Sequence, residues 1–145
     1  MILTPSITFG NVIDKLNEIG RFTKLNETLA ESGLNKNLKG NGPFTVFAPL
    51  DDAFAAISAK TYYGLLNENN KDKLIKILGR HVFSKKITSS EIDGEIKLKA
   101  INGEEIIIKK INGIVYINEA EVVTADVEVS NGVIHFINRV LQPLN

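Results

Sequence analysis

Apolar residues recur with a helical period near the start of the chain. Residues 11–19 and 21–32 each carry an apolar stripe, and each stretch is followed directly by a glycine, Gly20 or Gly33. Glycine favours the left-handed conformation that ends a helix, so two amphipathic helices are predicted. Shorter helices are predicted from the same pattern at 61–67 and 71–78, after an extended lead-in over residues 1–9.

The stretch between Gly42 and Ile57 combines a turn, a buried strand and a helix. A Gly-Pro pair precedes Phe44 to Ala48, whose aromatic and β-branched residues favour a buried strand. Pro49 lacks an amide donor and is expected to end the strand. Asp51 then stands where its carboxylate is expected to cap the helix that follows.

The second half of the chain changes to an alternating pattern, which is typical of strands with one wet face. The predicted strands are 95–100, 104–111, 114–118, 122–129 and 133–141, and the last is apolar on both faces, as in a central strand. Asn-Gly pairs at 102–103, 112–113 and 131–132 favour tight hairpin turns, because both residues accept a positive φ. Helices followed by hairpins predict an α+β domain.

The composition is that of one globular domain, expected to span residues 1–145. Seventeen basic residues balance seventeen acidic ones, so no overall field favours nucleic acid or an anionic membrane. Cysteine is absent, which excludes disulfides and Cys-ligated metal sites. No apolar run approaches the ~20 residues of a membrane span. Residues 1–10 show no secretion signal, which leaves open a cytosolic protein or one whose signal was removed.

Three segments carry a resemblance to a known family. Residues 45–54 (TVFAPLDDAF) resemble the first signature box of the fasciclin-like domain family, and residues 131–143 (NGVIHFINRVLQP) resemble its second box. Between them, Leu78 to Phe83 is similar to the family's central Tyr-His segment, with Arg80 where a tyrosine is usual. The segments keep the family's order and spacing, so the resemblance covers the chain from about residue 12 to 143 and indicates a single fasciclin-like domain.

The resemblance implies a fold in which N-terminal helices pack on a β-sandwich-like wedge of mostly antiparallel strands, with the two boxes side by side. The residues that it implies as structural signatures are Thr45, Phe47, Pro49, Asp51, Phe54, Asn131, Gly132, His135, Leu141 and Pro143. From the apolar pattern of the boxes, the core is predicted to contain Phe47, Phe54, Val133, Ile134, Ile137 and Leu141.

The resemblance also implies a non-catalytic adhesion module, secreted or at the cell surface. Its expected partner is a cell-surface or matrix protein or a polysaccharide; self-association is left open, and no cofactor is implied. The binding surface is expected around Arg80, His81, Val82 and Phe83. Some animal members bind integrins through the Tyr-His segment, and Arg80 in place of the tyrosine argues against that kind of recognition here.

A catalytic site in this chain would most readily use a histidine, and the chain has two, His81 and His135. His135 lies in the most apolar stretch and is expected to be buried and neutral, with a partner for each ring nitrogen. His81 borders a charged stretch and is expected to be partly exposed. The sequence shows no nucleophile elbow, metal-binding helix or phosphate loop, so neither catalytic nor metal-binding residues are predicted.

Two alternatives accompany the adhesion hypothesis. A carrier of an apolar small molecule, such as a carotenoid or lipid, would use some of the seven Phe and three Tyr residues, which core packing explains equally well. An enzyme would need Asp126, His81 or His135 to converge with a Ser or Thr in a cleft, and this alternative ranks last.

Overall fold

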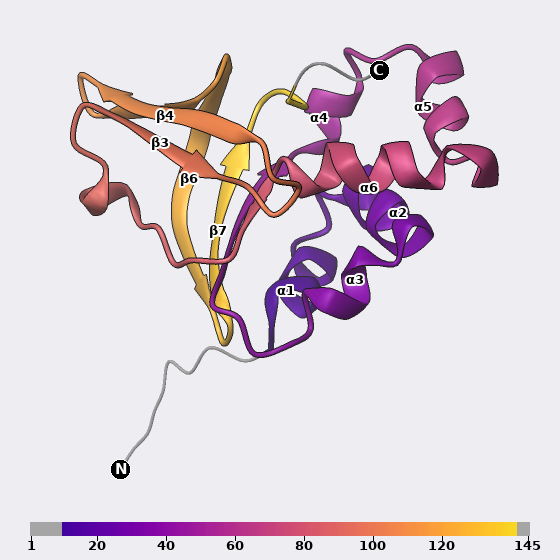
Figure 1. Cartoon of the computed structure of the whole chain (residues 1–145), viewed down its shortest axis with the longest axis horizontal. Coiled ribbons are helices and arrows are strands. Elements are labelled where there is room, and N and C mark those ends of the chain that lie inside the picture. Colours follow the sequence, from indigo (N-terminus) through magenta and orange to yellow (C-terminus); the bar gives the residue numbers. More distant parts are fainter. Residues whose placement is uncertain (1–9, 142–145) are drawn as a thin grey trace.

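The computed structural model describes residues 10–141 of the chain (Figure 1). The expected lead-in over residues 1–9 and the signature residue Pro143 lie outside the described residues. The elements are, in order, α1 (Val12–Ile19), α2 (Thr23–Ser32), α3 (Leu34–Asn37), β1 (Phe44–Pro49), α4 (Asp51–Phe54), α5 (Ala59–Leu65), η1 (Glu68–Asn70), α6 (Lys71–Gly79), β2 (Val82–Phe83), η2 (Ser89–Glu91), β3 (Glu95–Lys99), β4 (Glu105–Ile111), β5 (Ile114–Ile117), β6 (Ala120–Val129) and β7 (Gly132–Ile137).

The strands form a seven-stranded sheet in the order β2-β1-β7-β6-β5-β4-β3. Only β1 and β7 pair in parallel; the other neighbours are antiparallel. Figure 1 shows the sheet folding over itself into a wedge, with the helices gathered against one side. Just beyond β3, the Ile101 amide donates to the Val82 carbonyl of β2 at 2.9 Å, so the two ends of the sheet nearly close. The predicted α+β class and wedge are therefore confirmed.

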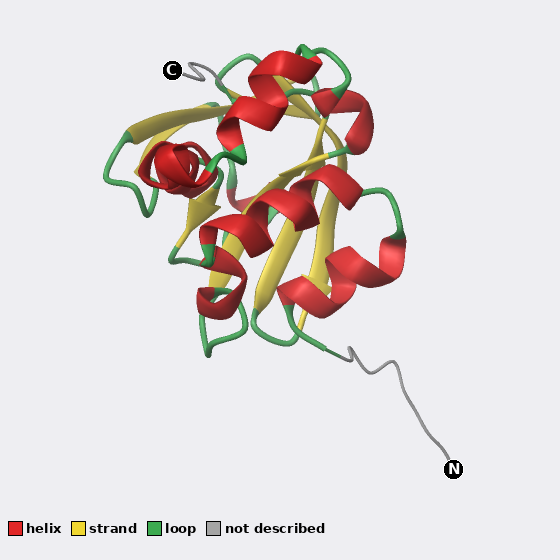
Figure 2. Cartoon of the chain, turned by 90° about the vertical axis from the view of Figure 1, so that its right-hand side faces the viewer, coloured by secondary structure: helices red, strands yellow, loops and turns green. Residues whose placement is uncertain are grey.

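The interior divides into two apolar clusters on opposite faces of the strands that carry the signature boxes. One lies between the helices and the sheet and includes Phe22, Leu74 and Phe136; the helix layer that covers this side of the sheet faces the viewer in Figure 2. The other fills the wedge and includes Phe47 and Ile108. All six predicted core residues are buried: Phe47, Phe54, Val133, Ile134, Ile137 and Leu141.

The parallel pairing of β1 and β7 places the two signature boxes side by side. Phe44 is opposite Gly132 at one end, and Pro49 is opposite Ile137 at the other. Pro49, which was expected to end the first strand, is the last residue of β1. The last strand, β7, was predicted to reach Leu141 but ends at Ile137. The strands come so close that a Cβ on Gly132 would lie 1.9 Å from the Phe44 carbonyl oxygen.

The three Asn-Gly pairs behave differently from one another. Asn112 and Gly113 form the predicted hairpin turn, with φ values of 53° and 83°. At residues 102–103 only Gly103 has a positive φ, at 92°. The third pair lies at a tight hairpin between β6 and β7, as predicted, but the turn is shifted by one residue: its residues are Ser130 and Asn131, and Gly132 already belongs to β7.

Asn131 lies in this turn, and its side chain is used in the interior, where the residue is 7% exposed. Its Oδ1 accepts the Val12 amide at 3.0 Å, and its Nδ2 donates to the Leu38 and Gly40 carbonyls at 2.7 and 2.8 Å. Its own carbonyl accepts the Phe44 amide at 2.9 Å. One side chain therefore joins α1, the end of α3 and the start of β7.

Asp51 caps a different helix from the one predicted. The N-cap of α4 is Leu50, and no side chain caps that helix. The Asp51 carboxylate instead accepts the Thr23 and Lys24 amides at 3.2 and 2.8 Å, at the start of α2. This exchange is possible because the N-cap of α2 is Phe22, whose side chain supplies no acceptor.

We expect Gly132→Ala to lower the free energy of unfolding by ~3 kcal/mol, because the added methyl forces β1 and β7 apart. Gly64→Ala is the matched control: Gly64 lies in α5 with no atom within 4 Å of the added Cβ, so alanine should raise stability by up to ~1 kcal/mol. Urea denaturation of both variants measures the difference. Equal stability of the two would contradict the close approach.

Candidate functional site

The central segment that was expected to bind a partner is buried. Arg80, His81, Val82 and Phe83 are 3%, 2%, 1% and 1% exposed. The expectation that His81 is partly exposed is therefore wrong. The segment turns from the end of α6 into β2, between the helix layer and the wedge, and in this conformation its side chains face the interior rather than a partner.

His81 ties the end of α6 to the chain that leaves β7. Its Nδ1 lies 2.9 Å from the Ile77 carbonyl and donates to it, while Nε2 accepts the Leu141 amide at 3.0 Å. Burial lowers the pKa of His81 to about 4, against the raising effect of the Ile77 carbonyl. The imidazole is thus neutral at physiological pH, with both nitrogens occupied.

Arg80 makes a second tie to the same part of the chain. Its Nε and Nη2 donate to Glu104 Oε1 at 3.0 and 2.8 Å, and its Nη1 donates to the Leu141 carbonyl at 3.4 Å. Asn102 Nδ2 adds a bond of 2.6 Å to the same Glu104 oxygen. The bond from Arg80 is the main reason that the pKa of Glu104 is lowered. In place of a tyrosine, this position therefore holds a buried cation with a carboxylate partner.

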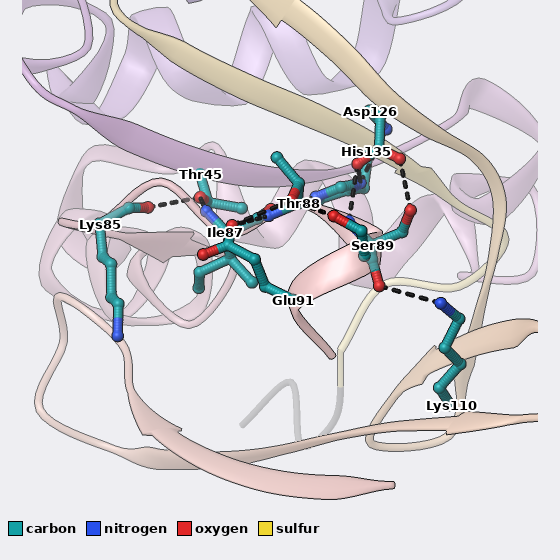
Figure 3. A network of polar contacts seen from close by, with 10 residues as sticks. Thr45, Lys85, Ile87, Thr88, Ser89, Glu91, Lys110, Asp126 and His135 are labelled. Atoms are coloured by element: carbon teal, nitrogen blue, oxygen red, sulfur yellow. Dashed lines mark hydrogen bonds and ion pairs between the residues drawn. The ribbon is translucent and has the colours of Figure 1, made fainter. Parts of the chain in front are cut away.

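His135 carries out the structural role that was predicted for it. Its Nε2 donates to the Ile87 carbonyl at 2.7 Å, and its Nδ1 accepts the Asp126 amide at 3.1 Å (Figure 3). The ring packs against Phe47, with 5.0 Å between centroids. Burial lowers the pKa of His135, so this imidazole is also neutral with both nitrogens occupied.

Asp126, Ser89 and His135 come together, as an enzyme would require, but in an arrangement that differs from a catalytic triad. The Ser89 hydroxyl donates to the Asp126 carboxylate, and the Ser89 amide donates to it at 2.8 Å (Figure 3). The nearest Asp126 oxygen is 4.0 Å from His135 Nδ1. Burial opposes ionisation of Asp126, but the Ser89 bonds and His135 outweigh it and lower the pKa. Since no imidazole nitrogen faces the serine, this contact holds the chain and lacks a base for the hydroxyl.

These contacts fasten the β2–β3 connection (residues 84–94) over the wedge. Thr45 of β1 donates its hydroxyl to the Lys85 carbonyl and accepts the Ile87 amide at 2.8 Å. His135 of β7 holds the Ile87 carbonyl, and Asp126 of β6 holds Ser89 (Figure 3). Asp126 reaches Ser89 from a bulge of β6, where its φ is 62°. Residues from both signature boxes therefore secure one irregular segment.

A groove of about 600 Å³ lies at the end of β7. We call it the β7-exit groove. Its walls are the α4–α5 connection, the two-residue turn between β5 and β6, and residues 138–141. The polar residues that line it are Ser58, Thr61, Asn118, Glu119, Asn138 and Arg139.

The sequence pattern did not predict the β7-exit groove. The available signal was the polar pair Asn138-Arg139, which interrupts an otherwise apolar stretch from Val133 to Leu141. Nothing in the sequence pattern placed that pair beside the α4–α5 connection, which is about 80 residues earlier in the chain. Among residues 10–141, no group of three or more His, Asp or Glu side chains is gathered to hold a metal ion.

The architecture defines the class of protein: an α+β domain with a nearly closed sheet, in which the first and last signature boxes pair in parallel. The fasciclin domain model matches residues 20–143. The chain therefore belongs to the fasciclin domain family, as the resemblance of its motifs predicted.

Relatives extend from microbes to vertebrates. The chain is 46% identical over 123 residues to protein sll1483 of Synechocystis sp., covering 84% of this chain and 67% of that protein. It is 35% identical over 142 residues to transforming growth factor-beta-induced protein ig-h3 of Sus scrofa, covering 98% of this chain but only 20% of that protein. The FAS1 domain pair from the insect cell adhesion molecule fasciclin I superposes with a TM-score of 0.83 at 21% identity, covering 94% of this chain and 52% of that one, which confirms the fold.

We expect the protein to lose stability in mild acid because of His81. The unfolded chain binds a proton on this side chain at a pKa near 6.5 and the folded chain only at about 4. The stabilising contribution is therefore complete above the unfolded value and is lost as the pH falls toward the folded one. Between pH 7 and pH 5 this group should lower the free energy of unfolding by ~2 kcal/mol, measured by urea denaturation.

The His81→Gln variant, which cannot titrate, isolates this effect. Its pH-dependent loss should be smaller than that of the wild type by ~2 kcal/mol, whatever its absolute stability. His135 remains in both proteins, and the carboxyl groups with lowered pKa values, Glu91, Glu104 and Asp126, start from ordinary values of 4.5, 4.5 and 3.8, below this pH window. An identical loss in both proteins would overturn the assignment to His81.

Proposed function

We propose that the protein is a non-catalytic binding and adhesion module that acts outside the cell or at its surface through contacts with a protein or a polysaccharide. Membership of the fasciclin domain family supports this proposal. The similar fold of the insect cell adhesion molecule fasciclin I is consistent with it. The chain spans only a fifth of the length of ig-h3, so an activity shared with that longer protein is part of the proposal.

The observation that carries the proposal is the use of both imidazoles of the chain as structural ties. Each ring nitrogen of His81 and of His135 has a main-chain partner, and both side chains are 2% exposed. General-base chemistry needs an imidazole nitrogen that can reach a substrate proton. Because both histidines hold the fold together, the domain is better suited to presenting a fixed binding surface than to general-base catalysis by histidine.

The aromatic side chains give the carrier hypothesis no comparable support. Phe22 packs edge to face against Phe136 with 4.9 Å between ring centroids, and Phe47 packs against Phe83 at 5.7 Å. These rings belong to the two apolar clusters. The β7-exit groove has polar as well as apolar walls, which suits a polar ligand better than a carotenoid or a lipid.

Location at the surface of the cell is part of the same proposal. None of the helices within residues 10–141 is long and apolar enough to cross a membrane. Equal numbers of acidic and basic residues give the domain no general attraction to charged polymers, so retention should depend on specific contacts.

The proposal can be tested by immobilising the domain and exposing it to two fractions from the surface of the source organism, the polysaccharides and the surface proteins. We expect one fraction to be retained at least roughly tenfold more than on a surface coated with heat-unfolded domain, because a folded surface makes the contacts. Retention should persist at 0.15 M salt, where contacts between exposed charges alone are largely screened. Equal retention on the folded and unfolded surfaces would refute the proposal.

A further inference from the structure

We infer that the β7-exit groove binds an acidic oligosaccharide, one that carries uronic-acid carboxylates. This inference rests on the proposed function and names its ligand class and site. The groove's volume of about 600 Å³ lies within the range of small-ligand sites, roughly 300–1,000 Å³. Its lining combines an apolar floor with several hydrogen-bond donors, and the donors decide the ligand.

The floor is made of small or buried apolar side chains. Ala53, Ala120, Val140 and Leu141 line the groove and are at most 6% exposed. Two further apolar residues of the lining, the exposed Ala56 and the half-buried Ile57, present the apolar surface against which the C–H groups of a sugar ring can lie. Deep side-chain pockets, which an extended peptide uses for specificity, would need larger residues along the walls.

Two asparagines on the rim are fixed by their amide oxygens. Asn138 Oδ1 accepts the Glu121 amide at 2.9 Å, and Asn118 Oδ1 accepts the Ile107 amide at 3.3 Å. Among residues 10–141, neither side-chain amide nitrogen has an acceptor. Each side chain is therefore held in place by its oxygen while its N–H groups stay available, which reduces the entropy lost when a ligand binds.

Further donors come from Arg139 and the α5 cap. The Arg139 guanidinium is exposed and has no partner among the described residues. Ser58 donates its hydroxyl to Thr61 Oγ1 at 2.9 Å and accepts the Thr61 amide at 3.1 Å, so the Thr61 hydroxyl proton is left to donate. Among the described residues, Glu119 is the one carboxylate in the lining. It can accept from a sugar hydroxyl.

The balance of donors and acceptors selects the ligand. A guanidinium, two primary amides and a hydroxyl present more N–H and O–H groups than the single Glu119 carboxylate can match. A uronic-acid saccharide supplies carboxylate and ring oxygens for these donors, with hydroxyls for Glu119. A neutral saccharide would leave Arg139 without an anionic partner.

Tri-galacturonate is the probe, titrated into ¹⁵N-labelled domain and followed by NMR and calorimetry. We expect chemical-shift changes centred on Ser58, Thr61, Asn118, Asn138 and Arg139. Binding to neutral cellotriose should be at least roughly tenfold weaker.

Asn138→Asp is the sharpest variant, because it keeps the oxygen that accepts the Glu121 amide and replaces the free N–H₂ group by a negative oxygen. Affinity for tri-galacturonate should fall at least roughly tenfold. Asn112→Asp is the matched control: it makes the same change in the exposed β4–β5 turn, away from the groove, and should leave affinity unchanged. Arg139→Gln should weaken binding and reduce its salt dependence.

Several outcomes would overturn the inference. Equal affinity of Asn138→Asp and Asn112→Asp for the probe would do so, as would shift changes elsewhere on the domain. Tri-glutamate binding at the groove as tightly as tri-galacturonate would show that the surface reads acidic peptides instead. If the domain is retained by its organism's surface while tri-galacturonate fails to bind, this inference falls and the proposed function stands; if neither interaction occurs, both fall.

Discussion

The parallel contact between β1 and β7 is the constraint on which the rest of the structure depends. It joins segments almost 90 residues apart, in register from Phe44–Gly132 to Pro49–Ile137. Its close approach excludes any side chain at Gly132. Parallel neighbours need a long crossover, and here the crossover consists of five helical elements (α4, α5, η1, α6 and η2), β2 and the whole outer half of the sheet. Both apolar clusters therefore form on either face of this one contact.

Buried polar side chains fasten irregular segments to that central contact. Asn131 holds α1 and the end of α3, Thr45 and His135 hold the β2–β3 connection, and His81 with Arg80 holds the chain after β7. Each bond of this kind satisfies a backbone group that would otherwise be buried without a partner. The signature residues Thr45, Asn131 and His135 thus help to hold the fold together.

Several features could be read from the sequence because they depend on local chemistry. The glycine stops of α1 and α2, the buried character of Phe47 and Ile134, and the Asn112-Gly113 turn all follow from neighbouring residues. The errors arose where distant partners intervened. Asp51 caps α2 because the fold brings Thr23 beside it, and Asn131, in the β6–β7 turn, lacks the predicted positive φ while its side-chain amide bonds three distant backbone groups. Arg80 and His81 also have distant partners, Glu104 and Leu141, and the contact role expected of them stays a prediction.

By itself, the sequence determined the class of fold, the family and most of the core, because apolar period and turn chemistry act over a few residues. Only the tertiary structure decided which polar residues face inward and which remain available. The sequence pattern did not mark Asn138 and Arg139 as site residues. They line a groove because β7 ends beside the α4–α5 connection. Hydrogen-bond partners and concave surfaces are set by distances between remote segments, which the local pattern does not encode.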